Sequence, residues 1–233
     1  TSFYFSCDSD VAMRAAVNSV LALHYRCGHT ADMVLEHIFA SGDKKQVGRP
    51  DLMIVPCAHM LSDAAFERLM HFAEAGGTVL LSGGAWRDEH CCVTDRLMSL
   101  FPDAAAVPMR SRESFILEGR ETEVTFYGAV EKWRNTAAVF QTTLFSGVPE
   151  VKTRPLGKGT LIVCPVPVEM SDCPRAVEQL YSYALRVSGT ENRVMEVREK
   201  NAGILIYPMV YDRATLYTFA NEGRQAAATV IDR

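Results

Sequence analysis

The sequence predicts an α/β fold built on a doubly wound, mainly parallel sheet with helices on both faces. Short apolar runs, typical of strands buried on both faces of a parallel sheet, alternate with amphipathic segments at helical spacing. Strand–helix–strand order of this kind favours right-handed crossovers between parallel strands. The composition agrees, because 48% of the 233 residues are hydrophobic and 22% are charged, as in a globular domain with a sizeable core.

Four strands and four helices make up this pattern. Asp10 and either Ser62 or Asp63 can serve as helix N-caps, Pro174 suits a first helical turn, and glycines follow the last turns. The predicted strands are Phe3–Ser6, Asp51–Pro56, Thr78–Leu81 and Thr160–Cys164. The predicted helices run from Asp10 to Gly28, from Ser62 or Asp63 to Gly76, from Cys91 to Phe101 and from Pro174 to Gly189.

Two other regions have the short apolar runs and turn residues of antiparallel strands. The first is predicted to be a β-hairpin insertion, with strands at Ser114–Leu117, Glu123–Tyr127, Ala137–Gln141 and Glu150–Arg154. The second is a small C-terminal antiparallel β unit, with strands at Arg193–Arg198, Gly203–Pro208, Ala214–Ala220 and Ala227–Ile231. We therefore expect an α/β domain over residues 1–189 and a small β domain over residues 190–233, with truncation of the latter left open.

Charge and cysteine content argue against several classes of protein. The net charge is −4 and no basic block is present, so nucleic acid and anionic membranes are not expected partners. No apolar run is long enough to span a bilayer, and the N-terminus lacks the basic segment of a signal peptide. Seven cysteines, an odd number with several in apolar runs, favour reduced thiols. We expect a cytoplasmic protein without a hyper-reactive cysteine.

Three stretches carry a resemblance to a known family. Asp51–Pro56 (DLMIVP), followed by a helix and by Gly76–Leu81 (GGTVLL), resembles the trimerisation domain of β-galactosidases of glycoside hydrolase family forty-two. Leu156–Val163 (LGKGTLIV) and the helix after it are similar to that domain's closing strand and helix. Thr215–Glu222 (TLYTFANE) resembles the small C-terminal β domain that follows it. The resemblance implies a flavodoxin-like fold of the class I glutamine-amidotransferase-like superfamily.

The same resemblance implies a role. In such enzymes an upstream (β/α)₈ barrel carries the two catalytic carboxylates, while this domain packs protomers together. A barrel needs about 250 residues, and the predicted strands and helices cannot supply eight βα units. The resemblance therefore implies a non-catalytic assembly or scaffold domain of a glycosidase acting on a β-linked sugar. Its expected partners are the upstream barrel and further copies of the parent, and no catalytic residue, cofactor or metal is expected in this chain.

An autonomous amidotransferase-like enzyme using Cys57 or Ser82 is the alternative. Catalytic members of the superfamily place a Cys on a strained turn after a strand, but here the strand Thr78–Leu81 is followed by Ser82-Gly83-Gly84. Leu80 stands where a serine nucleophile would want the first Gly of Gly-x-Ser-x-Gly. Cys57 and His59 follow the strand Asp51–Pro56 and could form a reactive pair, but in an extended chain they would point to opposite sides. A loop thiol beside a solvated or capping His is therefore the favoured interpretation.

Two further motifs predict no site. His90-Cys91-Cys92 offers soft ligands, but adjacent ligands cannot easily share a tetrahedral metal and no second pair completes the set. Gly157-Lys158-Gly159-Thr160 lacks the pattern of a phosphate loop and opens a strand rather than a helix, so a tight turn is the better interpretation.

The cluster Trp86-Arg87-Asp88-Glu89 is the strongest candidate for a contact surface. It lies just past Gly83-Gly84 at the carboxyl end of a predicted strand, and Trp and Arg anchor interfaces or stack on sugars. A Gly-flanked loop can project these side chains clear of the sheet, towards a partner protomer or a carbohydrate. The competing interpretation is a Trp tucked over the sheet edge with solvated charges beyond it.

Overall fold

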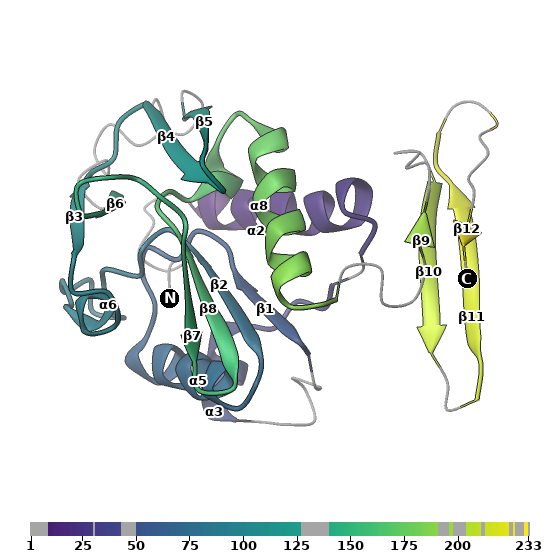
Figure 1. Ribbon diagram of the computed structural model, residues 1–233, viewed down its shortest axis with the longest axis horizontal. Coiled ribbons are helices and arrows are strands. Elements are labelled where there is room, and N and C mark those ends of the chain that lie inside the picture. Colours follow the sequence, from purple (N-terminus) through teal and green to yellow (C-terminus); the bar gives the residue numbers. More distant parts are fainter. Residues whose placement is uncertain are drawn as a thin grey trace.

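A computed structural model describes residues 9–29, 31–42, 50–126, 140–190, 196–197, 204–210, 213–223, 226 and 231–232. Within these residues the chain is a mixed α/β protein with one mostly parallel sheet and four small antiparallel sheets (Figure 1). The predicted α/β class is confirmed. The predicted strand Phe3–Ser6 lies outside the described residues.

The main sheet has four strands in the order β1-β2-β8-β7. Strands β1 (Leu52–Val55), β2 (Thr78–Ser82) and β8 (Gly159–Cys164) are parallel, and β7 (Lys152–Leu156) pairs antiparallel with β8. All five residues of β2 are buried, as expected of an apolar strand covered on both faces. Successive side chains enter different cores: Leu80 belongs to one cluster of buried residues, and Val79 and Leu81 to the other.

The helices cover the two faces of this sheet. On one side α2 (Ser9–Leu21), its π-helical extension η1 (Ala22–Arg26) and α8 (Pro174–Val187) contribute residues to the core that contains Leu80. On the other, α3 (Glu36–Ser41), α5 (Asp63–Glu74) and α6 (Arg96–Leu100) pack with Val79 and Leu81. Ser62 is the N-cap of α5, since its hydroxyl accepts a hydrogen bond from the amide of Ala65 at 3.3 Å.

The predicted helix Cys91–Phe101 is wrong in its first half. Only α6 is helical, and the preceding residues form a compact turn. Asp88 Oδ1 accepts hydrogen bonds from the amides of His90 (2.9 Å) and Cys92 (2.8 Å), and Cys91 has a left-handed φ of 64°. Side-chain acceptors of this kind compete with helical hydrogen bonds for backbone N–H groups, which is why the apolar spacing did not produce a helix here.

The insertion between β2 and β8 contains two antiparallel pairs. β4 (Arg112–Leu117) and β5 (Arg120–Thr125) form the predicted hairpin, while β3 (Ala104–Pro108), which the sequence did not indicate, pairs with β6 (Gln141–Phe145). Of the predicted strand Ala137–Gln141, residues 137–139 lie outside the described residues. The predicted strand Glu150–Arg154 corresponds to β7, which joins the main sheet instead of the insertion.

The turn Gly157-Lys158 joins β7 to β8 and packs against the end of α5. Gly157 has a φ of 59°, and the amide of Lys158 donates to Glu74 O at 3.0 Å. A Cβ on Gly159 would overlap the carbonyl oxygens of Gly77 and Ala73. The glycines therefore serve a tight turn with close backbone approach, as predicted.

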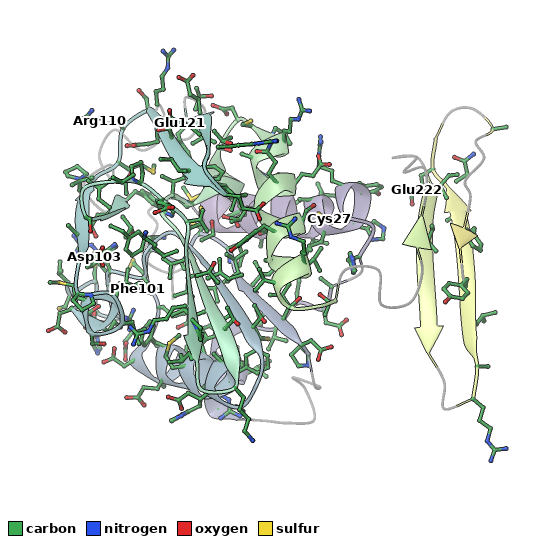
Figure 2. All side chains as sticks on the ribbon, viewed as in Figure 1. Cys27, Phe101, Asp103, Arg110, Glu121 and Glu222 are labelled. Atoms are coloured by element: carbon green, nitrogen blue, oxygen red, sulfur yellow. The ribbon has the colours of Figure 1, made fainter. Side chains whose placement is uncertain are left out.

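Beyond α8 lies an antiparallel β unit. β10 (Ile204–Val210) pairs with β11 (Thr215–Asn221), and β9 (Glu196–Val197) pairs with β12 (Ile231–Asp232). It stands beside the α/β body (Figure 1), and Glu222, labelled in Figure 2, accepts a hydrogen bond from Tyr25 Oη of η1 at 2.7 Å. The boundary between residues 189 and 190 stays a prediction. Among the described helices, none combines the length and apolarity needed to cross a membrane.

Candidate functional site

The candidate site lies at the carboxyl edge of the sheet, the edge at which β1, β2 and β8 end. Parallel sheets carry their ligands at this edge, and the loops that leave it bring together Cys57, His59, Ser82 and Trp86 from the sequence predictions. All four are buried, each less than 7% exposed. Ser82 and the amide of Cys57 contact a group that sequence reasoning missed, the carboxyl of Glu169.

Glu169 is completely buried in the short 3₁₀ helix η2 (Val168–Met170), just past β8. Its Oε2 accepts a hydrogen bond from Ser82 Oγ at 2.6 Å and its Oε1 accepts one from Tyr181 Oη at 2.7 Å. The amide of Cys57 approaches Oε2 at 3.4 Å, and Tyr181 Oη in turn contacts Ser19 Oγ. Burial raises the pKa of Glu169, and the hydrogen bonds from Ser82 and Tyr181 oppose that rise. Within the described residues no Lys or Arg forms an ion pair with it.

Cys57 and His59 do meet, but in a form unsuited to catalysis. Cys57 has a left-handed φ of 51°, and its Sγ lies 3.5 Å from His59 Nδ1. Burial, together with the nearby Glu169 carboxyl, raises the pKa of the Cys57 thiol well above its ordinary value. Burial also lowers the pKa of His59 from 6.5 to about 4. A neutral thiol beside a weakly basic imidazole, both without access to solvent, is a poor nucleophile pair.

His59 has an unusual environment. Its ring packs against Phe140 with centroids 4.4 Å apart, and its Nδ1 lies 3.2 Å from Cys57 O. Its Nε2 is buried and has no hydrogen-bond partner in the part of the chain that the structure describes. Protonation would place a charge in this apolar surrounding, which explains the direction of its pKa shift.

Ser82 is a structural hydroxyl. Besides donating to Glu169, its Oγ lies 3.3 Å from Val166 O and accepts a hydrogen bond from the amide of Val168 at 3.3 Å. It therefore ties the end of β2 to the chain that follows β8. A nucleophilic serine would need to be exposed at a turn, and Ser82 is fully buried.

Trp86 is 4% exposed and belongs to the core on the α5 side of the sheet. Its Nε1 donates to Thr143 Oγ1 at 2.9 Å, which satisfies the indole. A Cβ on Gly84 would overlap both the indole and the Thr143 hydroxyl, so glycine at this position lets the ring fold back over the sheet. Burial of Trp86 agrees with the competing interpretation, a Trp tucked over the sheet, and contradicts the expectation that the loop projects this side chain clear of the sheet.

The charged neighbours of Trp86 brace the same loop. Arg87 Nη1 donates to Cys91 O at 2.6 Å, Asp88 Oδ1 accepts the two amides described above, and Glu89 Oε2 accepts the amide of Asp63 at 3.1 Å. These contacts hold the turn at 88–92 against the start of α5.

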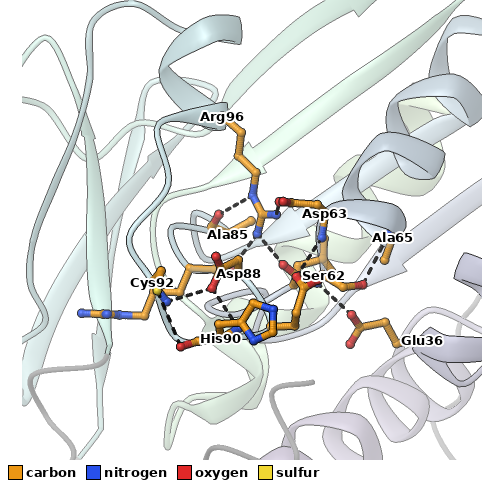
Figure 3. A network of polar contacts seen from close by, with 12 residues as sticks. Glu36, Ser62, Asp63, Ala65, Ala85, Asp88, His90, Cys92 and Arg96 are labelled. Carbon is orange, nitrogen blue, oxygen red and sulfur yellow. Dashed lines mark hydrogen bonds and ion pairs between the residues drawn. The ribbon is translucent and has the colours of Figure 1, made fainter.

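Arg96 completes the arrangement, and sequence reasoning missed it (Figure 3). Its guanidinium donates to four oxygens, and its side chain is only 11% exposed. The acceptors are Ala85 O at 3.1 Å, Leu61 O and Arg87 O at 2.7 Å each, and Asp63 Oδ1 at 2.9 Å. The guanidinium also lies over the Phe66 ring, 4.7 Å from its centroid. One side chain thus joins the loop after β1, the loop after β2 and the first turn of α5.

An open groove of about 850 Å³ borders this network. Trp86, Arg96 and Ala104 line it, together with the apolar side chains of Val93 and Met98. Val93, in the loop before α6, is 65% exposed and Met98, in α6 itself, is 44% exposed, so solvent reaches both of these apolar side chains. No group of three His, Cys, Asp or Glu side chains within the described ranges is placed to hold a metal ion. The six cysteines that the structure describes, including Cys91 and Cys92, are free thiols.

Comparison with known proteins finds the fold only among solved structures. No protein-family model and no curated protein matches the sequence. The GH42 β-galactosidase Gan42B of G. stearothermophilus is similar over 94% of this chain, with a TM-score of 0.61 and 16% identity. The β-galactosidase of Bacillus circulans sp. alkalophilus is similar over 90%, with a TM-score of 0.59 and 13% identity. That of Rahnella sp. R3 is similar over 89%, with a TM-score of 0.55 and 15% identity.

The match covers only part of each of these enzymes. The chain spans 32% of Gan42B and 31% of the other two. At such low identity the comparison establishes a shared fold: this chain has the fold of one portion of several β-galactosidases.

The first prediction concerns Arg96. Arg96→Ala removes four hydrogen bonds and leaves buried carbonyl groups without a donor, so it should lower the free energy of unfolding by about 3 kcal/mol. Arg26→Ala is the control, because the exposed Arg26–Glu178 ion pair should contribute about 0.5 kcal/mol or less. Chemical denaturation measures both, and equal small losses would show that Arg96 does not hold the loops.

The second prediction is a dependence of stability on pH through His59. The folded state keeps His59 neutral down to about pH 4, whereas the unfolded state takes up a proton near pH 6.5. Stability should therefore fall as the pH drops from 6.5 to about 4, by about 3 kcal/mol from this residue. The difference in unfolding free energy between wild type and His59→Gln isolates this effect, since both proteins retain Glu169. The exposed residue His71, replaced in His71→Gln, is the control, and a wild-type minus His59→Gln difference that does not change with pH would contradict the assignment.

The third prediction concerns the thiols. Iodoacetamide should modify the exposed Cys92 readily, while Cys57 in the folded protein should react at least about a hundredfold more slowly. Peptide mass spectrometry after timed labelling separates the two sites, and labelling in denaturant confirms that Cys57 is detectable. Rapid native labelling of Cys57 would instead favour the enzyme hypothesis.

Proposed function

We propose that this chain is a non-catalytic assembly domain of a larger glycoside hydrolase that acts on a β-linked sugar, such as a β-galactoside. One observation carries the proposal: the carboxyl edge of the sheet, where an α/β enzyme holds its reacting groups, is closed. Glu169, Ser82 and Cys57 are buried and their polar atoms contact one another or the backbone. The similarity in fold to about one third of several β-galactosidases supports the same conclusion.

The finer parts of the proposal follow from the sequence. The α/β part over residues 1–189 is proposed to be flavodoxin-like and related to the class I glutamine amidotransferases, with residues 190–233 as a small β domain. Its partners would be an upstream catalytic barrel and further copies of the parent, in a cytoplasmic enzyme. The two alternative functions are disfavoured by burial: an amidotransferase-like enzyme would need an accessible Cys57 or Ser82, and a sugar-binding module would need an accessible Trp86.

The fourth prediction is that the purified 233-residue chain does not hydrolyse aryl β-galactosides. Glycosidic cleavage requires two carboxyl groups facing each other across the scissile bond, and the completely buried Glu169 cannot reach a sugar. The measurement compares this chain with the full-length parent at equal molar concentration. Turnover by the chain alone that disappears on replacing one of its own carboxylates would overturn the proposal.

The fifth prediction places part of the assembly contact on the loop after β2. Because Trp86 is internal, the groups of this loop that could face another protomer are Arg87, Glu89 and the exposed Val93. In the full-length parent, Val93→Asp should shift the oligomer towards smaller species on dilution, since a charge in a contact that buries about 2,000 Å² is costly. A heterologous contact must close into a ring to avoid filaments, so the wild type should be a discrete cyclic oligomer.

Val17→Asp on α2 is the matched control, because Val17 is an equally ordinary exposed apolar residue, 45% accessible, at a different place on the chain. Light scattering over a dilution series compares the three proteins. Identical behaviour of both variants would remove the loop from the contact, and a monomeric wild-type parent would remove the assembly role itself.

A further inference from the structure

The open groove beside the Arg96 network combines exposed apolar side chains with a concave surface. Val93 is 65% exposed and Met98 44%, and both line this groove of about 850 Å³. Single exposed apolar side chains are normal on a protein surface, but two large ones that share a groove favour contact with another molecule. The groove is therefore a candidate docking surface.

Small side chains leave the groove open. It is lined by α6 and β3, which contact each other (Figure 1). The contribution of β3 is the run Ala104–Ala106, and the loop before α6 and α6 itself contribute Val93 and Met98. Because alanine side chains occupy little space, aliphatic side chains of another molecule can pack between these alanines and the larger apolar residues.

The charged groups at the groove are mainly acidic. Asp63 and Asp95 line it, and Arg96 is the one cation among the described residues that do so. Asp88 and Glu89 lie close enough to act electrostatically on the Arg96 guanidinium. Figure 3 shows Asp63 and Asp88 beside this guanidinium. Four carboxylates thus lie near one cationic lining residue.

The cations of this region are already engaged within the protein. The side chain of Arg96 is 11% exposed, and it donates to three carbonyl groups and to Asp63. Arg87 donates to Cys91 O and has a buried Nε. In contrast, the Asp63 side chain is 66% exposed and Asp95 is exposed as well. A molecule that approaches the groove therefore meets carboxylates beside apolar side chains.

We propose that the groove binds a cationic segment of another protomer of the parent, one that presents aliphatic side chains flanked by Lys or Arg. The inference rests on the assembly role proposed above and adds the chemistry of the partner. Aliphatic side chains of the segment lose contact with water beside Val93 and Met98, which drives binding. Its Lys or Arg side chains approach Asp63 and Asp95, which selects a cationic partner over an anionic one.

Titration of the 233-residue chain with three blocked hexapeptides tests this chemistry. The probes are Lys-Lys-Leu-Leu-Lys-Lys, its charge-reversed counterpart Glu-Glu-Leu-Leu-Glu-Glu and its polar counterpart Lys-Lys-Ser-Ser-Lys-Lys. Methyl NMR signals of Val93 and Met98 report binding. The first peptide should bind at least about tenfold more tightly than either counterpart at about 0.05 M salt, and its advantage over the acidic peptide should shrink at about 0.5 M salt. Equal binding of the first two peptides, or of the first and third, would overturn the proposal.

A matched pair of charge reversals locates the site. Asp95→Lys should weaken binding of the cationic peptide at least about threefold, because it places an ammonium group at the groove. Glu123→Lys makes the same change at an exposed residue of β5 that does not line the groove, and it should leave binding unchanged. Equal losses in the two variants would show a general attraction to a negative chain and would overturn the assignment. If Asp95→Lys does not fold, the three peptides on the wild type still decide the chemistry.

The same two variants in the full-length parent separate this inference from the assembly role. In light scattering over a dilution series, Asp95→Lys should dissociate at a higher concentration than Glu123→Lys. An oligomeric parent of equal stability in both variants would overturn the proposed occupant and leave the assembly role intact. A monomeric wild-type parent would remove both.

Discussion

The buried carboxyl of Glu169 is the constraint on which the carboxyl edge of the sheet depends. A carboxyl group that has left water must find hydrogen-bond partners, since an unpartnered one costs several kcal/mol. The partners come from separate elements: Ser82 ends β2, Tyr181 lies in α8, and the Cys57 amide follows β1. Their convergence fixes three elements against η2. The hydrogen bonds to Glu169 also occupy the Ser82 hydroxyl and the Cys57 amide, polar groups that a catalytic site at this edge would need for its substrate.

Arg96 performs the corresponding task farther from the sheet. Where Glu169 collects donors inside the core, Arg96 supplies donors to the carbonyl groups of two loops and to Asp63. Trp86 belongs to the core on the α5 side of the sheet, and its indole donates a hydrogen bond to Thr143. The loops after β1 and β2 are thus held in two ways: core packing fixes Trp86, and the Arg96 guanidinium binds the loop carbonyl groups. This double restraint gives the loops one shape and leaves Val93, rather than Trp86, at the surface.

The strands and helices that an apolar sequence pattern specifies were predicted well, whereas the buried carboxyl of Glu169 and its partners were not. β1, β2 and β8 follow continuous apolar runs, and α5 and α8 follow helical spacing with a cap at Ser62 and a proline at Pro174. These are local signals. Glu169 carries none, because its burial depends on Ser82 and Tyr181, which are distant in sequence.

Arg96 lacked a local signal in the same way. It looks like a surface residue of a helix until its four acceptors are known. A projecting Trp86 was one of two interpretations, because a Gly-flanked loop can carry its side chains clear of the sheet, whereas Gly84 provides the space into which the ring folds.

The loops at this edge contain strained backbone conformations but no reactive nucleophile. Of the non-glycine residues with left-handed φ within the described part of the chain, Cys57, Ala85 and Cys91 lie in the loops after β1 and β2. Such conformations cost about 1–3 kcal/mol each and persist only where surrounding contacts impose them. Cys57 has the sharp turn after a strand that a nucleophile uses, but burial keeps its thiol protonated and its neighbouring His59 neutral. Cys57 therefore does not form a reactive thiolate. The Glu169 and Arg96 networks compensate the backbone strain, and the strained turns set the shape of the two loops. The buried thiol and the maintained loop shape are consistent with the assembly role proposed above.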